Sequence, residues 1–406
     1  MAQEDLPFEV IVTILMLLPA ESLIRLMCVS KAWYALITNA EFIQNHLQIM
    51  ASRGNEYILC GPIKVFSPAK SDLLCAKDPN FAYKMGVPST FDSRHCLHVS
   101  SSYGLVLMSG AYNFGKTLYL WNPCIRKYKC ISSSCIDIKK SNRLGSSLVV
   151  GFGYLNQAND YKIVRIVYIE KDDDHFLDED NDYMDGDDHD DIGGDVNEII
   201  EMEIDEDISA SKAESSSNDD RTTEVEVYSL TRDSWKKVEI QSFRWFLCDY
   251  FTRAFVNNCV HWMVFYRRVN EDESMILAFD LEKEAFQQIT VPHYEDDVAE
   301  YVESIVHKEA LGFVVIYPQE TTELCSLWEM KEYGLVESWS KVFNVEVGGT
   351  IYRPFTITKN DQIMFKGENQ GLSLYSFQSQ EIKTVTVKLD SDELDFLSTV
   401  DSLILL

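Results

Sequence analysis

The stretch LYLWNPCIRKY (residues 118–128) is an apolar strand ending in an aromatic residue, then a polar turn, then a second bulky residue. The same pattern recurs as VEVYSLTRDSW (225–235) and ILAFDLEKEAF (276–286). In each copy, seven positions separate the two bulky residues, which form the pairs Trp121/Tyr128, Tyr228/Trp235 and Phe279/Phe286. Apolar runs separated by polar turns predict β-strands. Such a unit buries its aromatic residues only against a neighbouring unit, so the pattern predicts a repeat architecture.

Strand-like runs of this kind continue from about residue 55 to the end of the chain. A weaker copy has Tyr375 and Ile382, and a stretched one has Trp328 and Trp339. Small antiparallel sheets that recur about every 45 residues predict a β-propeller. About six blades are expected, with five or seven as alternatives. The final run, 397–406, is expected to pair with an early strand near 57–59, because an unpaired edge strand promotes aggregation.

Residues 5–49 have a different pattern, in which apolar residues recur at helical spacing. Pro7 is a good first-turn residue, and a helix is predicted by the spacing of Val10, Ile11, Ile14, Leu15 and Leu18. Pro19 ends this helix, and two or three further short helices follow, one of them capped by Ser30. The core of so small a bundle is barely sufficient by itself. Its surplus apolar surface therefore predicts a partner protein.

This segment resembles an F-box in the order and spacing of Leu6-Pro7, Ile14-Leu15, Leu18-Pro19 and Val29-Ser30-Lys31-x-Trp33. In that family, the bundle binds a Skp-type adaptor, which links it to a cullin and a RING-bound ubiquitin-conjugating enzyme. By position, the resemblance implies these adaptor contacts, some of which must instead be bundle core: Leu6, Pro7, Ile11, Ile14, Leu15, Leu18, Pro19, Val29 and Trp33. An ordinary helical hairpin packed on the larger domain is the alternative interpretation.

The β-rich remainder is similar to the plant F-box-associated domain, a group that includes S-locus-type and kelch-like F-box proteins. The resemblance rests on the strings 120–123 with 126–127, 151–154 with 160–165, and 226–230 with 234–236. The chain departs from true kelch repeats, since outside the acidic insertion its only paired glycines in this domain are Gly348 and Gly349. The resemblance implies a small all-α F-box followed by an all-β, kelch-like propeller.

The formal net charge of −29 disfavours binding to nucleic acid, which requires a basic surface. Residues 171–223 hold 22 Asp or Glu against 3 Lys or Arg, so most of this charge is local. A segment so poor in apolar residues is expected to be a long disordered loop, inserted into a hairpin. Two interpretations stay open: a solvated insertion without a dedicated role, and an electrostatic attractant for a basic target.

The sequence indicates neither catalysis nor a cofactor. It lacks the common nucleophile, phosphate-loop, dinucleotide and zinc-protease motifs. Calcium loops placed around Gly186 or Gly193 end in isoleucine rather than glutamate, so tight calcium binding is not expected. The ten cysteines contain no Cys-x-x-Cys pair and are expected to be reduced thiols, without a metal site. No apolar run is long enough to cross a membrane, so no membrane partner is expected.

The expected division is an F-box in residues 1–50 and an F-box-associated, propeller-like substrate-recognition domain in residues 51–406, with the insertion at 171–223. The implied function is the substrate-recognition subunit of a Skp-cullin-F-box ubiquitin ligase in the cytoplasm or nucleus. Its target is unknown; a basic protein is one expectation, and an S-locus-type ribonuclease is one candidate by resemblance. A non-proteolytic F-box scaffold and, less favoured, a propeller enzyme are the alternatives.

Overall fold

A computed structural model gives the fold of the chain. It describes residues 6–404 except for segments that mostly lie between strands: 54–55, 63–71, 79–80, 87–95, 111–116, 132–133, 137–147, 170–221, 241–253, 269–270, 295–298, 300, 320–321, 349–351, 358–361, 367–370, 380 and 389–393. The predicted acidic insertion therefore lies outside the described residues, apart from its last two.

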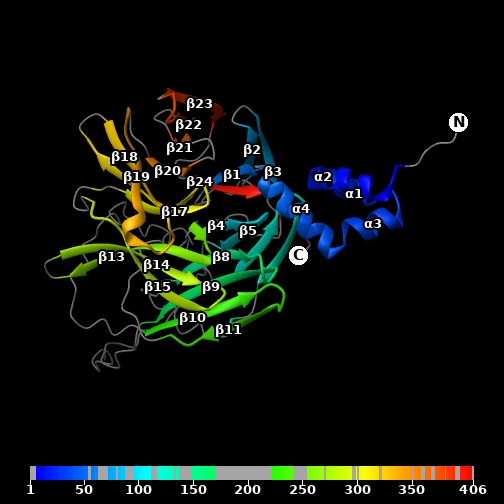
Figure 1. Cartoon of the computed structure of the whole chain (residues 1–406), viewed down its shortest axis with the longest axis horizontal. Coiled ribbons are helices and arrows are strands. Elements are labelled where there is room, and N and C mark those ends of the chain that lie inside the picture. The colour runs from blue at the N-terminus through cyan, green and yellow to red at the C-terminus, as the bar shows by residue number, and fades with distance from the viewer. Residues whose placement is uncertain are drawn as a thin grey trace, which may run out of the picture.

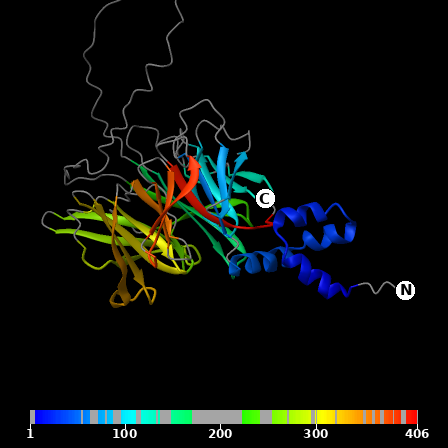
Figure 2. The same cartoon turned by 90° about the horizontal axis from the view of Figure 1, so that it is seen from above.

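Four helices form the N-terminal bundle: α1 (Phe8–Met16), α2 (Ala20–Leu26), α3 (Lys31–Ile37) and α4 (Ala40–Ser52). Proline precedes the first residue of both α1 and α2, where its missing N–H costs no hydrogen bond. The Ser30 hydroxyl accepts a hydrogen bond from the Trp33 N–H at 3.2 Å, which confirms Ser30 as the N-cap of α3. The Asn39 side chain caps α4 in the same way. α4 runs from this bundle to the edge of the β-rich part (Figures 1 and 2).

The β-rich part consists of four-stranded antiparallel sheets that follow one another along the chain. The first contains β24 (Leu394–Val400), β1 (Glu56–Pro62), β2 (Asp72–Asp78) and β3 (Phe81–Gly86); the second contains β4 (Cys96–Ser102), β5 (Leu105–Gly110), β6 (Leu118–Asn122) and β7 (Lys127–Ile131). The third contains β8 (Leu148–Leu155), β9 (Asp160–Ile169), β10 (Thr222–Ser229) and β11 (Ser234–Val238).

The remaining sheets have the same composition. The fourth contains β12 (Ala254–Val256), β13 (Cys259–Arg268), β14 (Glu271–Asp280) and β15 (Ala285–Thr290); the fifth contains β16 (Tyr301–His307), β17 (Ala310–Pro318), β18 (Thr322–Met330) and β19 (Trp339–Gly348). The sixth contains β20 (Tyr352–Ile357), β21 (Gln362–Lys366), β22 (Gly371–Ser376) and β23 (Glu381–Lys388). A short 3-10 helix, η5 (Val336–Ser338), lies between β18 and β19.

The sheets contact one another in a closed ring. Strand β24 touches β4, β4 touches β8, β8 touches β13, β12 touches β16, β16 touches β20, and β20 returns to β24. The described residues therefore form a β-propeller of six four-stranded sheets (Figure 1).

The first and last strands close this ring. β1 pairs with β24 in an antiparallel register that places Tyr57 opposite Thr399 and Leu59 opposite Leu397. The predicted pairing between the end of the chain and an early strand is thus confirmed as far as Val400, where β24 ends. Residues 401–404 leave the sheet.

The aromatic pairs of the repeats are direct cross-strand neighbours. Trp121 pairs with Tyr128, Tyr228 with Trp235, and Phe279 with Phe286, because the intervening turn brings residues seven apart into register. The first member of each pair is buried, as predicted. The second lies on the outermost strand, which has fewer neighbours: Tyr128 is 37% exposed, and Ile382, the second residue of the weaker pair, is 45% exposed. The expectation that the aromatic residues are core positions was wrong for Tyr128.

Antiparallel connectivity gives the propeller two different faces. The tight turns that join the first to the second and the third to the fourth strand of a sheet lie together on one face, which we call the short-turn face. They contain all the non-glycine residues with positive φ in the described part of the chain, from Tyr103 to Glu309. The other connections, including residues 170–221, leave from the opposite face, which we call the long-loop face.

Residues 170–221 connect two paired strands. Ile169 at the end of β9 lies opposite Thr222 at the start of β10, so the prediction that the insertion separates two neighbouring strands is confirmed. Thr222 and Thr223, which the sequence pattern assigned to the insertion, belong to β10. Their β-branched side chains suit a strand.

Candidate functional site

The N-terminal helix α1 has two apolar faces. Leu15 is 2% exposed and packs in a cluster that includes Leu23, Ile37 and Phe42. About 100° around the helix from Leu15, Ile14 is 47% exposed, and Val10, one turn before Ile14, is 41% exposed. Leu17, which follows the helix three residues after Ile14, is 41% exposed. Spacings of four and three residues place these three side chains in one row.

The rest of the bundle carries further exposed apolar side chains. Of the 13 large hydrophobic residues with exposed side chains in the described part of the chain, seven lie in this small bundle: Leu6, Phe8, Val10, Ile14, Leu17, Val29 and Tyr34. Such a concentration on a bundle of four short helices indicates a protein-binding surface. We call these seven residues the exposed apolar face.

The nine residues that the sequence resemblance assigns to adaptor contacts differ in exposure. Leu6, Pro7, Ile14, Pro19 and Val29 are exposed; Ile11, Leu18 and Trp33 are half-buried; Leu15 is buried. Leu15 therefore belongs to the bundle core in this structure. Four exposed apolar residues are absent from the assigned set: Phe8, Val10, Leu17 and Tyr34. The sequence signal for this second face was the spacing of Val10, Ile14 and Leu17. Each of them directly precedes a residue of the other row, which contains Ile11, Leu15 and Leu18.

The bundle is joined to the short-turn face of the propeller through α4. The Gln48 amide donates a hydrogen bond to the Asn156 side chain, in the turn between β8 and β9, at 3.3 Å. His46 on the same helix is fully buried, and its Nε2 donates to the Leu18 carbonyl at 2.8 Å. Burial lowers the pKa of His46 below its ordinary value. These contacts place the exposed apolar face outside the propeller, free of its strands.

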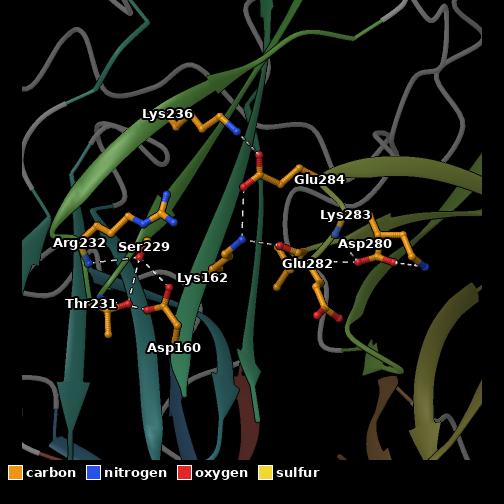
Figure 3. Close-up of polar contacts among 11 residues, drawn as sticks. Asp160, Lys162, Ser229, Thr231, Arg232, Lys236, Asp280, Glu282, Lys283 and Glu284 are labelled. Carbon is orange, nitrogen blue, oxygen red and sulfur yellow. Dashed lines mark hydrogen bonds and ion pairs between the residues drawn. The ribbon is translucent and has the colours of Figure 1, made fainter. Parts of the chain in front are cut away.

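Two lysines of the third sheet pair with a glutamate in a turn of the fourth sheet (Figure 3). Glu284 accepts from Lys236 at 2.7 Å and from Lys162 at 3.3 Å, which links the two sheets. Burial acts to raise the pKa of Glu284, but the hydrogen bonds from these lysines hold it below its usual value.

Neighbouring turns hold carboxylates in the same way. Asp160 accepts from the Ser229 hydroxyl at 2.6 Å and the Thr231 N–H at 2.9 Å, and Asp280 accepts from the Lys283 ammonium at 2.9 Å (Figure 3). These carboxylates stabilise turns, because their acceptor oxygens are occupied by the protein itself. In the part of the chain that the structure describes, no three His, Cys, Asp or Glu side chains are grouped to hold a metal ion. No described helix has the length and apolar character that crossing a membrane requires.

A helical bundle with an exposed apolar face, joined to a propeller, defines a two-part binding protein. The F-box domain model matches residues 4–45, and the F-box associated beta propeller domain model matches residues 207–405. The chain belongs to the F-box proteins that carry a C-terminal F-box-associated β-propeller domain. Proteins of this family are non-catalytic substrate receptors, so membership implies the receptor role in a Skp-cullin-F-box ubiquitin ligase and binding to its Skp-type adaptor.

Relatives with similar sequences are also named as F-box proteins. The chain is 24% identical over 402 residues to the F-box protein CPR1 of Arabidopsis thaliana, a match that covers 94% of this chain and 84% of that protein. It is 28% identical over 169 residues to the Arabidopsis F-box/kelch-repeat protein At3g23880, covering 40% and 45%. Among solved structures, a Pyrococcus horikoshii acylaminoacyl peptidase is 8% identical with a TM-score of 0.37, covering 82% of this chain and 51% of that one. A likeness this low carries no argument about function.

Proposed function

We propose that this chain is the substrate-recognition subunit of a Skp-cullin-F-box ubiquitin ligase, acting in the cytoplasm or nucleus. Its N-terminal bundle binds the Skp-type adaptor, and its propeller binds a target protein for ubiquitination and degradation. The observation that carries the proposal is the exposed apolar face of a bundle whose core is already formed by other apolar residues.

The adaptor contacts follow from exposure. Val10, Ile14 and Leu17 form the centre of the surface, since they share one row on α1, and the bundle has four further exposed apolar residues: Leu6, Phe8, Val29 and Tyr34. Complete burial of one such aliphatic side chain contributes roughly 1.5–3 kcal/mol, and a few such residues dominate most interfaces. Leu15 supports the same surface from inside, because it holds α1 against the other helices.

The double variant Val10→Asp/Ile14→Asp tests this assignment. Two carboxylates on the exposed row would have to be buried against an apolar partner, so adaptor affinity should fall at least about 100-fold. Both side chains are exposed, so the unfolding temperature should change little. Adaptor binding is measured by calorimetry with purified adaptor and full-length receptor.

Ile382→Asp is the matched control, because Ile382 is also an exposed isoleucine, at 45% against 47% for Ile14, but lies on β23 of the propeller. It should bind the adaptor like the unchanged protein. Leu15→Asp should instead unfold the bundle. Wild-type affinity in the double variant would refute the proposed docking surface.

The target-binding part of the proposal concerns the long-loop face. The bundle contacts the short-turn face through α4, whereas the chain leaves β9 at Ile169 and re-enters β10 at Thr222 on the opposite face. The strongly acidic residues 171–221 are thus attached to the face that points away from the bundle's contacts. This supports a basic target protein, since opposite charges accelerate encounter. A basic secreted-type ribonuclease of the S-locus class remains one candidate.

A further inference from the structure

The last described residues of the chain lie between the bundle and the propeller. After β24 ends at Val400, Asp401 is 4% exposed, and Ser402 and Leu403 are fully buried. Figure 2 shows β24, in red, running toward the helices. The buried side-chain carboxylate of Asp401 needs hydrogen-bond partners, because burial of an unpaired charge is strongly unfavourable. Those partners lie on both sides of the segment.

On the bundle side, Asp401 binds the start of α2. Its carboxylate oxygen Oδ2 accepts a hydrogen bond from the Ala20 N–H at 3.0 Å, across 381 positions of sequence. The residue before α2 is Pro19, which supplies no side-chain cap. A carboxylate at a helix N-terminus satisfies a free N–H group and interacts favourably with the helix dipole. The C-terminal segment therefore supplies the cap that the local sequence lacks.

Leu403 adds an apolar contact to the same bundle. Its fully buried side chain is part of the cluster formed by Leu15, Ala20, Leu23 and their neighbours on α3 and α4. A residue near the C-terminus thus completes the core of the N-terminal helices. This contact and the Asp401 hydrogen bond both connect the same short segment to the bundle.

On the propeller side, Asn122 holds the backbone of the segment. Its amide group donates to the carbonyls of Ser402 at 3.1 Å and Ile404 at 3.0 Å, while its own carbonyl accepts from the Cys124 N–H at 3.0 Å. Asn122 is fully buried and belongs to the Leu-Trp-Asn-Pro string at 120–123. Gly104, with φ of +83°, leaves room for Ser402, because a Cβ at that position would overlap the Ser402 side chain.

We propose that residues 401–404 are a C-terminal clamp, which fixes the adaptor-binding bundle in one orientation on the propeller. Asp401 and Leu403 would then be positioning residues for ubiquitin transfer. Without the clamp, the two parts would be held together by the short connection from α4 to β1 and by the contacts of α4, such as Gln48 with Asn156. A second attachment point limits the rotation of the bundle relative to the propeller. The target bound to the propeller is then held at a constant distance from the rest of the ligase. This inference rests on the proposed receptor function.

The experiment uses full-length Asp401→Ala and Leu403→Asp variants, with Glu381→Ala, an exposed propeller carboxylate, as the control. Hydrogen exchange of α2 is measured by mass spectrometry on the free proteins. Loss of a charge-assisted hydrogen bond should accelerate exchange of the Ala20 amide by about tenfold. Exchange in β13 and β14, which the clamp does not touch, should not change. A variant with residues 401–406 deleted, which keeps β24, covers the case in which a point variant misfolds.

Ubiquitin transfer provides the readout that distinguishes positioning from stability. In a reconstituted ligase, ubiquitin linked to the receptor's own lysines is mapped by mass spectrometry. The unchanged protein and Glu381→Ala should be modified at the same restricted set of lysines, and the clamp variants at a broader set. The clamp would be overturned if hydrogen exchange in α2 were the same in the clamp variants as in the unchanged protein. It would also be overturned if the same lysines were modified in every protein. Failure of the unchanged protein to bind the adaptor would instead reject the receptor function, while the exchange result would still decide on the clamp.

Discussion

The propeller contains a buried ion pair whose charged groups are hydrogen-bonded to neighbouring residues. Arg165 and Glu226 are both at most 1% exposed and form an ion pair, with Arg165 Nε donating to Glu226 at 2.6 Å. The Ser134 hydroxyl and the Cys135 N–H also donate to the Glu226 carboxylate, at 2.9 and 2.8 Å. The Arg165 guanidinium stacks over the Trp235 ring at 4.3 Å. This set explains a buried pair without any catalytic role.

His261 is a buried histidine with a pH-dependent effect on stability. Its Nδ1 donates to the Ala254 carbonyl at 3.2 Å, and its Nε2 lies 2.9 Å from the Tyr333 hydroxyl. Burial lowers the pKa of His261 from 6.5 to about 4. Between these values the unfolded chain takes up a proton that the folded chain does not. The stabilisation is therefore present above pH 6.5 and is lost as the pH falls toward about 4.

We predict that His261→Gln makes the free energy of unfolding less dependent on pH in this interval. The shift in the pKa of His261 corresponds to up to about 3 kcal/mol. Urea unfolding at several pH values between 7 and 4 measures it, with the exposed His293→Gln as the control. Parallel pH profiles for the unchanged protein and His261→Gln would contradict the prediction.

At the level of elements, hairpin register explains the repeat pattern. A spacing of seven residues places Trp121 opposite Tyr128 because the turn between them is short. In the fifth sheet, residues 331–338 and a register shift beside Trp328 lengthen the interval, and Trp339 lies opposite Met330. Sequence spacing therefore identified the third and fourth strands of most sheets. The inner strands, such as the three-residue β12, carry no comparable pattern.

The hairpin of β9 and β10 should not depend on the residues that connect it. We predict that replacing residues 170–221 with Asn-Gly, a turn suited to paired strands, preserves the fold. Ile169 and Thr222 are already opposite one another, so a tight turn can join them. Shortening the loop lowers the entropic cost of closing it, which should raise the unfolding free energy by up to about 3 kcal/mol. Thermal and urea unfolding measure the change. A clear loss of stability would show that residues 170–221 pack on the propeller.

For the whole molecule, the two faces of the propeller separate the helical bundle from the acidic residues. The helices approach the short-turn face, and residues 170–221 are attached to the long-loop face. Residues 171–221 contain most of the excess negative charge in a chain whose net charge is −29. In the proposed function, the adaptor surface is apolar, whereas the acidic long-loop face attracts a basic target.

This arrangement predicts basic targets. Affinity purification under proteasome inhibition, followed by mass spectrometry, should recover proteins with a higher average isoelectric point from the full chain than from the Asn-Gly replacement variant. The difference should shrink at high ionic strength, where screening weakens the attraction. Adaptor recovery serves as the internal control and should be equal for both proteins. Identical target sets at low and high salt would exclude the electrostatic role.

The sequence by itself determined the helical bundle, the repeated hairpins and the family, because helix periodicity and hairpin spacing act within a few residues. It did not separate Leu15, in the core, from Ile14, its exposed neighbour, since both fit one apolar helix pattern. Nor did it show that Asp401 and Leu403 complete the N-terminal bundle. Only the tertiary structure decided these points. Ring closure brings the two chain ends together, and contacts between such distant segments leave no local pattern in the sequence.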